Sequence, residues 1–450
     1  MFFQSINPYN GNIFSEYKVL TDKELDEKLK ISAKAFKNWR NTSFDERSQK
    51  MKRVASILSD KKEVLANLIT AEMGKIISES RSEIEKSAGN CDYYAQNAEK
   101  YLSDEPLDTT FKSFTVYDPV GAVFAIMPWN FPFWQVFRYA APTIMAGNVT
   151  LLKHSPNTMG CAKAIEKVFL DAGFPEGVFQ ELTIGIPQVE RVIASNIVQG
   201  VTLTGSEFAG SSVAALAGKY IKKSVLELGG SDAFIVLDDA DLEQAAKVAT
   251  QSRMLNAGQV CISAKRFIAT EKIADQFLEI FSKNVKKLKQ GNPMSEEVQI
   301  GPLARLDLAK KLEFQIKKGI EQGAKLVIGG GVEGCNFQPT ILDQVKPDNI
   351  TFVEETFGPI ATMIRAKNEI EALELANAHR YGLASSIWTN DREKAYKLAR
   401  KLEAGNVFVN SMVRSDSRIP FGGIKKSGYG RELGAIGIRE FMNMKTIVME

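Results

Sequence analysis

The sequence predicts an α/β protein of two domains, each built on a parallel, doubly wound sheet. Strand-like apolar runs alternate with helical patterns from about residue 120, and a second alternating series begins near residue 241. Such alternation favours right-handed crossovers between parallel strands. The 450 residues allow two or three domains at about 100–200 residues each.

The first 100 residues are predicted to be mainly amphipathic helices. Residues 21–24 (TDKE) and 43–46 (SFDE) both match the capping box, a pattern that begins helices. Apolar residues follow the first box at spacings of four, four and three: Leu25, Leu29, Ala33 and Phe36. Residues 111–119 then predict an extended strand that stands apart from these helices.

The first alternating series contains six strand-like runs, most of them separated by a helical pattern such as residues 159–170. The runs are residues 123–127, 149–153, 178–182, 200–203, 225–228 and 234–237. The second series predicts a helix at residues 242–255, a strand at 266–270, and helices at 274–288 and 306–322. Residues 445–449 predict a terminal strand, and a partner subunit could cover its edge.

Composition excludes several classes of function. A formal net charge of +3 with 25% charged residues is typical of a soluble globular enzyme and does not favour nucleic-acid binding. The chain has only two histidines, His154 and His379, so we expect no metal site. Its four cysteines show no Cys-x-x-Cys spacing. No signal-peptide pattern and no apolar stretch of 18 residues occurs, so we expect a cytoplasmic protein that binds no membrane.

Two glycine motifs are candidates for phosphate binding. Residues 329–334 (GGGVEG) formally match a dinucleotide fingerprint, but no helix pattern follows, so we interpret them as a tight turn. Thr204-Gly205-Ser206 ends a strand and precedes a plausible helix at 208–216. Backbone amides at such a helix start can hold phosphate oxygens. The same three residues are equally compatible with an ordinary helix N-cap.

Cys261 is the candidate nucleophile. It follows Asn256-Ala-Gly-Gln-Val, where polar and glycine residues suit a turn that presents sulfur to a cleft. A thiolate is the strongest common side-chain nucleophile. The other cysteines are interpreted as small buried apolar residues: Cys91, Cys161 and Cys335.

Glu227 and Asn130 are candidate partners of this thiol. Glu227 lies between two leucines at a strand end, where burial would raise its pKa towards that of a general base. Asn130 lies between prolines and aromatic residues that would hold its amide rigidly as an oxyanion donor. A surface glutamate and a simple turn amide are the alternatives.

Taken together, six segments resemble, in order, the signature segments of the NAD(P)-dependent aldehyde dehydrogenase superfamily. They are Pro128-Trp-Asn-Phe-Pro132, Thr204-Gly-Ser206, Leu226-Glu-Leu-Gly-Gly230, Gly258-Gln-Val-Cys261, Glu355-Thr-Phe-Gly-Pro359 and Pro420-Phe-Gly-Gly-Ile-Lys-Lys-Ser-Gly428. The resemblance spans nearly the whole chain and includes the 34 residues from Glu227 to Cys261.

The resemblance implies a role for each candidate. Cys261 would attack an aldehyde, Asn130 and the Cys261 backbone N–H would hold the oxyanion, and Glu227 would activate water to hydrolyse a thioester. It also implies a set of cofactor-binding residues: Trp129, Lys153, Ser155, Pro156, Gly205, Ser206, Leu228, Glu355 and Phe357.

The sequence departs from the family pattern three residues after Lys153. Many NAD-specific members carry a glutamate there, which repels a 2′-phosphate, whereas this chain has Pro156. We therefore expect the enzyme to use both NAD and NADP.

Within the superfamily, several segments resemble the shorter bacterial succinate-semialdehyde dehydrogenases most. Arg138 and Ser415 occupy places of substrate-carboxylate contacts in that class. A second arginine of the class is replaced by Leu255, and Arg253 and Arg414 are the two candidates to compensate for it. A surface cation is the alternative for Arg138, and a pocket for apolar or aromatic aldehydes is the alternative for specificity.

The resemblance implies a three-part subunit that forms a homodimer or homotetramer. The expected parts are a cofactor domain (1–100 and 120–229), a catalytic domain (230–428) and an oligomerisation arm (101–119 and 437–450). Two other functions compete with aldehyde oxidation: a catalytically silent binding or structural member of the fold, and an acylating enzyme that transfers its thioester to coenzyme A. The intact Cys261, Glu227 and Asn130 argue against the first, and Glu227 favours hydrolysis over the second, because acylating relatives commonly lack this base.

Overall fold

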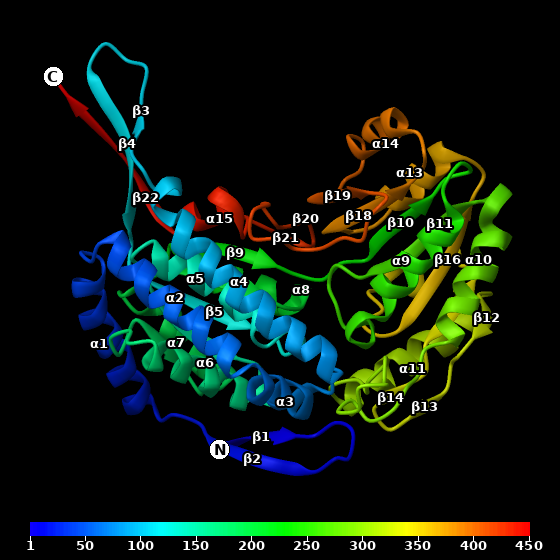
Figure 1. Cartoon of the computed structure of the whole chain (residues 1–450), viewed down its shortest axis with the longest axis horizontal. Coiled ribbons are helices and arrows are strands. Elements are labelled where there is room, and N and C mark those ends of the chain that lie inside the picture. Colours follow the sequence, from blue (N-terminus) through cyan, green and yellow to red (C-terminus); the bar gives the residue numbers. More distant parts are fainter.

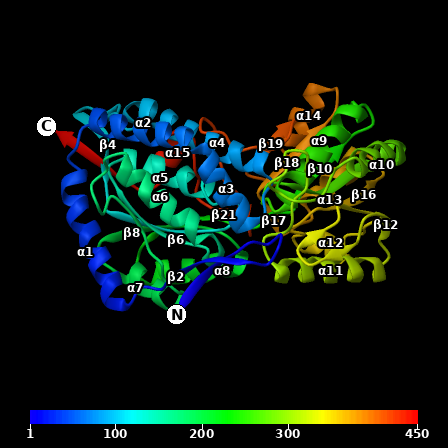
Figure 2. The ribbon, with the colours of Figure 1, turned by 60° about the horizontal axis from the view of Figure 1, so that its bottom comes forward.

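The computed structural model describes residues 1–450, and the chain forms two lobes that lie side by side (Figures 1 and 2). The first lobe contains a six-stranded sheet with the order β21-β9-β8-β5-β6-β7, parallel except for β21. Its strands are β5 (Ala122–Met127), β6 (Val149–His154), β7 (Phe179–Glu181), β8 (Val198–Thr204), β9 (Lys223–Glu227) and β21 (Gly428–Tyr429). Five of the six strand-like runs of the first predicted series are confirmed in this sheet, whereas the run 234–237 belongs to β10 (Asp232–Val236) of the second lobe.

Helices cover both faces of the first sheet, as its parallel strands require. They are α1 (Asp22–Trp39), α2 (Phe44–Asp60), α3 (Lys62–Met73), α4 (Ile77–Tyr101), α5 (Trp134–Met145), α6 (Met159–Asp171), α7 (Val189–Ala194) and α8 (Glu207–Lys219). Thr21 caps α1 in a complete capping box, and Ser43 caps α2. The sequence prediction missed one element, the hairpin of β1 (Phe2–Ile6) and β2 (Ile13–Lys18).

The second lobe contains a seven-stranded sheet with the order β12-β15-β16-β11-β10-β18-β19, in which only β12 is antiparallel. Its strands are β10 (Asp232–Val236), β11 (Ala264–Thr270), β12 (Lys325–Ile328), β15 (Thr340–Asp343), β16 (Ile360–Ala366), β18 (Ala384–Trp388) and β19 (Asn406–Val409). Its helices are α9 (Leu242–Met254), α10 (Glu271–Lys286), α11 (Leu306–Glu321), α12 (Ile350–Val353), α13 (Glu369–Asn377) and α14 (Arg392–Ala399).

The glycine-rich segment 329–334 forms no phosphate loop. Gly329, Gly330 and Gly334 have φ values of 81°, 87° and 58°, and the chain turns through them into the small hairpin of β13 (Val332–Glu333) and β14 (Asn336–Phe337). The interpretation as a turn is correct.

The two lobes have separate apolar cores, and the chain returns to the first core near its C-terminus. Phe421, Leu433 and Ile438 belong to that first core. We expected the second domain to extend to residue 428, whereas Phe421 already packs with the first lobe. A short ladder of β17 (Tyr381–Gly382) with β20 (Ile424–Lys425) lies at this crossing.

A three-stranded arm projects from the first lobe (Figure 1). After α15 (Gly434–Arg439), strand β22 (Met442–Met449) pairs along its whole length with β4 (Lys112–Pro119), and β4 pairs with β3 (Glu105–Pro106). The terminal strand is therefore longer than predicted, and one of its edges is paired within its own chain. No helix is both long and apolar enough to span a bilayer.

Candidate active site

Seven of the nine predicted cofactor-binding residues lie at the carboxyl ends of the first sheet, and the other two, Glu355 and Phe357, come from the second lobe. Trp129 follows β5, Ser155 and Pro156 follow β6, Gly205 follows β8, and Leu228 follows β9. The strand order reverses between β5 and β8, which lie side by side although β6 and β7 come between them in the chain. Ligands of open α/β sheets bind at such a reversal, outside the carboxyl ends.

Helix α8 begins directly at this edge. Ser206 is its N-cap, with the side chain accepting a hydrogen bond from the Ala209 amide at 3.2 Å. A Cβ built on Gly205 would have only the Leu203 side chain, at 3.5 Å, nearby, so a ligand can approach the backbone. At Gly210, by contrast, a Cβ would lie 2.5 Å from the Leu228 side chain, so α8 can pack this close only with glycine there. Both interpretations of Thr204-Gly-Ser206 are thus compatible with the structure.

The residues present fit a dinucleotide. Lys153 is 8% exposed, and its ammonium makes neither a hydrogen bond nor an ion pair within the chain. Burial lowers the pKa of Lys153, and the Glu181 carboxylate opposes that shift. A buried cation without a protein partner suits ligand hydroxyls or a phosphate. The rings of Trp129 and Phe357 meet edge to face, with centroids 5.8 Å apart, which brings one predicted cofactor residue from each lobe together.

Cys261 lies at the end of a strained loop. Asn256, Ala257 and Gly258 have φ values of 52°, 50° and 72°, three consecutive left-handed residues after α9. Such strain outside glycine concentrates at functional sites. Gly258 is required, because a Cβ there would lie 2.2 Å from the Gly358 carbonyl oxygen.

Arg253 anchors this loop. It does not line the cavity that opens beside Cys261. Its buried guanidinium donates to the carbonyls of Gly258 at 3.1 Å and Thr356 at 3.0 Å, and to that of Gly358. It also donates to the Ser263 hydroxyl at 3.0 Å. The suggestion that Arg253 compensates for the missing substrate arginine is therefore wrong, because both terminal guanidinium nitrogens are bonded to the protein itself and Arg253 does not line the cavity.

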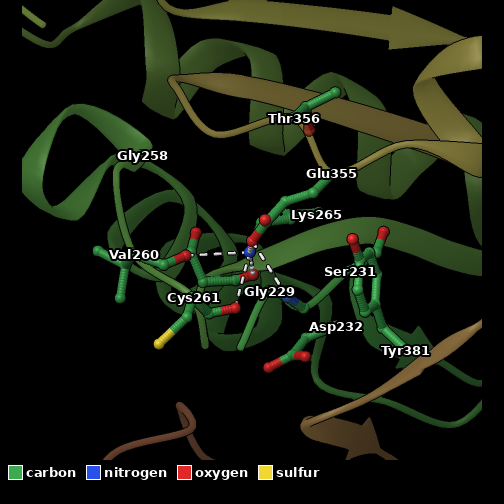
Figure 3. A network of polar contacts seen from close by, with 12 residues as sticks. Gly229, Ser231, Asp232, Gly258, Val260, Cys261, Lys265, Glu355, Thr356 and Tyr381 are labelled. Carbon is green, nitrogen blue, oxygen red and sulfur yellow. Dashed lines mark hydrogen bonds and ion pairs between the residues drawn. The ribbon is translucent and has the colours of Figure 1, made fainter. Parts of the chain in front are cut away.

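Lys265 organises the other side of the nucleophile loop (Figure 3). Its buried ammonium donates to the carbonyl oxygens of Val260 at 2.9 Å and Cys261 at 2.7 Å, and lies 3.5 Å from the Glu355 carboxylate. Glu355 in turn accepts from the Gly230 amide at 3.1 Å. Figure 3 shows the Cys261 sulfur pointing away from this network. Lys265 thus fixes the backbone of Cys261 and leaves its thiol free.

Asn130 is buried against the same loop. Its side-chain amide donates to the Gln259 carbonyl at 2.9 Å, and its own backbone carbonyl accepts from the Asn256 side chain at 2.9 Å. Gln259 also accepts from the Ala304 amide at 2.9 Å through its side chain. The segment after β5 and the nucleophile loop are therefore locked together, as the proposed oxyanion role of Asn130 requires.

Glu227 is a buried carboxylate, not a surface residue. It is 2% exposed, and neither of its side-chain oxygens has a hydrogen-bond partner. Burial raises the pKa of Glu227 well above its usual range, with Arg138 opposing and Glu432 reinforcing the shift. Burial also raises the pKa of the Cys261 thiol to about 11, while Arg138 and Lys265 act against this rise. Glu227 acts electrostatically on Cys261 as well, so the two groups share one environment.

A cavity of about 730 Å³ opens beside Cys261. Arg138, Arg414 and Ser415 line it, as does Leu255. Arg138 is 2% exposed, so the alternative of a surface cation is wrong. Its guanidinium pairs with Glu432, donates to Thr204 at 3.3 Å, and lies over the Phe421 ring at 5.0 Å.

The sequence analysis missed two lysines at the site. Lys265 begins a buried strand next to a second cation, Arg266, and that unusual pair in an apolar run was an available signal. Lys86 reaches the cavity from α4, where its neighbours Glu85 and Ser87 give it the appearance of an ordinary surface lysine. No local pattern identifies it.

Both histidines are structural. His154 bonds the Pro132 carbonyl at 3.0 Å, and burial lowers its pKa to about 4. His379 bonds the Phe352 carbonyl at 2.9 Å, and burial lowers its pKa to about 3. Both rings are therefore neutral at pH 7, and the first ties the Asn130 segment to β6.

This combination of two α/β lobes, a presented cysteine, a buried carboxylate and a dinucleotide edge defines an aldehyde-oxidising dehydrogenase. The chain belongs to the aldehyde dehydrogenase family, whose model matches residues 1–447.

Two curated relatives resemble the chain along its whole length. The probable succinate-semialdehyde dehydrogenase [NADP(+)] of Synechocystis sp. is 47% identical over 99% of both chains. The succinate semialdehyde dehydrogenase [NAD(P)+] Sad of Escherichia coli K12 is 46% identical over 98% of this chain and 97% of its own. A solved structure, succinic semialdehyde dehydrogenase from Streptococcus pyogenes with NADP+, superposes with a TM-score of 0.98 at 39% identity, covering 99% of both chains.

Proposed function

We propose that the protein oxidises an aldehyde to its carboxylic acid with NADP or NAD, through a thioester on Cys261. The observation that carries this proposal is the pairing of a cysteine that faces a cavity of about 730 Å³ with a buried, unpartnered carboxylate, Glu227. The Glu227 carboxylate makes no hydrogen bond within the protein, and each of the two groups supplies one half of the chemistry.

The first step is attack of the Cys261 sulfur on the aldehyde carbon. With a pKa of about 11 the thiol carries its proton at neutral pH, so the proton must leave as the sulfur–carbon bond forms. Glu227 is the available acceptor, because burial raises the pKa of its carboxyl group and so makes the carboxylate a stronger base.

The carbonyl oxygen becomes an oxyanion in this step. Asn130 offers its side-chain amide, which has two N–H groups, and one of them is bonded to the Gln259 carbonyl. The second N–H and the Cys261 backbone N–H are the proposed donors. Removing one such donor costs about 3–4 kcal/mol in measured cases.

A bound nicotinamide would accept the hydride that leaves the former aldehyde carbon. We assign cofactor binding to Lys153, Ser155 and Pro156 after β6, to Gly205 and Ser206 before α8, and to Trp129, Leu228, Glu355 and Phe357. Pro156 carries no charge to repel a 2′-phosphate, which supports use of NADP beside NAD.

Hydrolysis of the thioester completes the reaction. The proton that Glu227 took from the thiol first passes to solvent. Glu227 then removes a proton from water, the hydroxide attacks the thioester carbon, and the departing Cys261 sulfur takes up that proton as the acid is released. A carboxylate without hydrogen-bond partners is free to take this role. It also favours water over coenzyme A as the acceptor of the acyl group.

Succinic semialdehyde is the proposed substrate. The relatives from Synechocystis and Escherichia coli carry that name at 47% and 46% identity, and the cavity has cationic walls. Broad activity on uncharged aldehydes is the alternative. A catalytically silent protein would not need Cys261 and Glu227 in this arrangement.

The arm and the compartment complete the proposal. The outer edge of β22 and its exposed residues Met444 and Val448 support assembly of the arm into a homodimer or homotetramer. We keep the cytoplasm as the proposed location, because the four cysteines are free thiols, as in a reducing compartment.

The test is formation of NADPH and NADH from succinic semialdehyde and from butanal, with and without coenzyme A. Activity with both cofactors, preference for succinic semialdehyde, and no stimulation by coenzyme A are expected. Full activity in Cys261→Ala would refute the mechanism.

A further inference from the structure

Four cations line the substrate cavity, and their charges are not equally available. They are Lys86, Arg138, Arg414 and the exposed Lys247. Arg138 forms an ion pair with the buried Glu432, so much of its charge is already compensated. A substrate carboxylate competes with Glu432 for that guanidinium.

Lys86 has no carboxylate partner. Its ammonium donates to the Ser415 hydroxyl at 2.8 Å and lies 4.1 Å from the centre of the Trp134 ring. It belongs to no ion pair in the chain, although its side chain faces the cavity. An ammonium has three donors, and Ser415 uses one of them.

The nearest acids are committed elsewhere. Glu83, one turn earlier on α4, pairs with Lys75 and accepts from the Phe133 and Trp134 amides at 2.8 and 3.0 Å. Asp416, next to Ser415, is held by Arg418 at 2.6 Å. Neither carboxylate is free to neutralise Lys86. The other acids that line the cavity, Glu79 and Glu296, are bound to the Asn256 amide and to Arg81, so the charge of Lys86 has no carboxylate partner.

The surroundings of Lys86 destabilise its charged form when no anionic ligand is bound. Desolvation by the protein lowers the pKa of Lys86 to about 8, with Arg138 and Lys75 acting in the same direction and Glu83 and Asp416 opposing them. An anion bound beside the ammonium would reverse this effect.

We propose that Lys86 and Ser415 together bind the carboxylate at the far end of the substrate and so select aldehydes that carry an acid group. This inference rests on the proposed function and deepens it. It also explains how the enzyme can work with Leu255 in place of the second substrate arginine of related enzymes. Leu255 lines the same cavity without a charge, and Lys86 supplies from α4 the positive charge that position 255 lacks.

The test compares two substrates in three variants. Succinic semialdehyde and butanal share a four-carbon chain and differ in the carboxylate, so the ratio of their kcat/KM values isolates its recognition. Lys86→Met should lower this ratio about 10- to 100-fold, as expected for loss of a hydrogen bond to a charged group. Lys86→Arg should retain most of it. Lys100→Met, on an exposed turn at the end of the same helix, is the matched control and should leave it unchanged.

A pH series adds a readout that a structural role would not change. Because kcat/KM reports groups of the free enzyme, the wild-type ratio should fall as pH rises through about 8, where Lys86 loses its proton. In Lys86→Arg the fall of the ratio near pH 8 should be absent. Titration of Cys261 and Glu227 affects both substrates and cancels. Glu79, which also lines the cavity and whose pKa burial raises to about 7, titrates in both proteins, so the difference between the two pH profiles reports Lys86.

The outcomes separate the two proposals. A wild-type enzyme without preference for succinic semialdehyde overturns the proposed substrate and this inference with it. A wild-type preference that Lys86→Met retains, in a variant with unchanged thermal stability, overturns the role of Lys86 alone. Loss of the preference in Lys86→Met with butanal activity intact supports it.

Discussion

Replacing Glu227 by glutamine separates the two halves of the proposed reaction. Glutamine has the same shape but cannot accept a proton, and the native carboxylate makes no hydrogen bond that the amide would disrupt. Loss of a general base costs about 10²- to 10⁴-fold. Both proposed steps use Glu227, but the thiol can also lose its proton to water, whereas hydrolysis of the thioester needs a base held next to the attacking water. We therefore expect Glu227→Gln to turn over more slowly by that factor and to accumulate acyl-enzyme on Cys261.

Stopped-flow measurement of NADPH formation, with intact-mass analysis of the quenched protein, tests this expectation. The variant should form about one NADPH per subunit before the slow phase, and its mass should include one succinyl group. Glu72→Gln is the control, because Glu72 is also buried but binds the Gly160 and Cys161 amides on α6. Rapid turnover of Glu227→Gln without an acyl-enzyme would refute the assignment of Glu227.

The stability of Glu227→Gln relative to wild type should depend on pH in a predictable way. Burial raises the pKa of Glu227 in the folded state above its unfolded value. The cost of burying the charge is therefore absent below the unfolded pKa, grows as pH rises towards the folded pKa, and is constant above it. Glu227→Gln lacks this cost, so its advantage over wild type in urea unfolding should increase across that window, by about 1.4 kcal/mol per pKa unit. An advantage that does not change with pH would contradict this account.

Three further predictions concern the cofactor, the nucleophile loop and the first helix. Pro156→Glu should lower kcat/KM for NADP about 10- to 100-fold through repulsion of a 2′-phosphate and leave that for NAD nearly unchanged, as steady-state kinetics would reveal. Arg253→Met leaves the buried carbonyls of Gly258 and Thr356 without donors, so urea unfolding should show a loss of about 3–5 kcal/mol, and an unchanged midpoint would contradict the anchoring role. Thr21→Ala removes the N-cap of α1 and should cost about 1 kcal/mol in the same assay, whereas the exposed Lys23→Ala should cost less.

Local sequence patterns were sufficient to predict most of the fold. Alternating strand and helix patterns predict both sheets because parallel strands buried on two faces are continuous apolar runs. The hairpin at residues 2–18 was missed because its strands are short and half exposed, with Phe2 and Ile13 on the surface. Its Asn10-Gly11 turn was the available signal.

Residues of the site were predictable only where the reactive side chain lies within a contiguous sequence motif. Cys261, Glu227 and Asn130 each stand in such a segment. Arg253 and Lys86 acquire their roles from residues more than 100 positions away, Thr356 and Ser415 respectively. One sequence does not reveal such pairings, so Arg253 was assigned to the wrong task and Lys86 to none.

The closing strand of the first sheet has a consequence for how the protein is made. Strand β21 pairs with β9, placing Gly428 opposite Glu227, and Phe421, Leu433 and Ile438 complete the first core. During synthesis, the first lobe cannot complete its sheet and its core until the entire second lobe has been made. Until then the edge of β9 is unpaired and the core lacks its C-terminal residues. Nascent chains that stop before these last residues should remain targets for chaperones and proteases, even though every residue proposed for catalysis has already emerged.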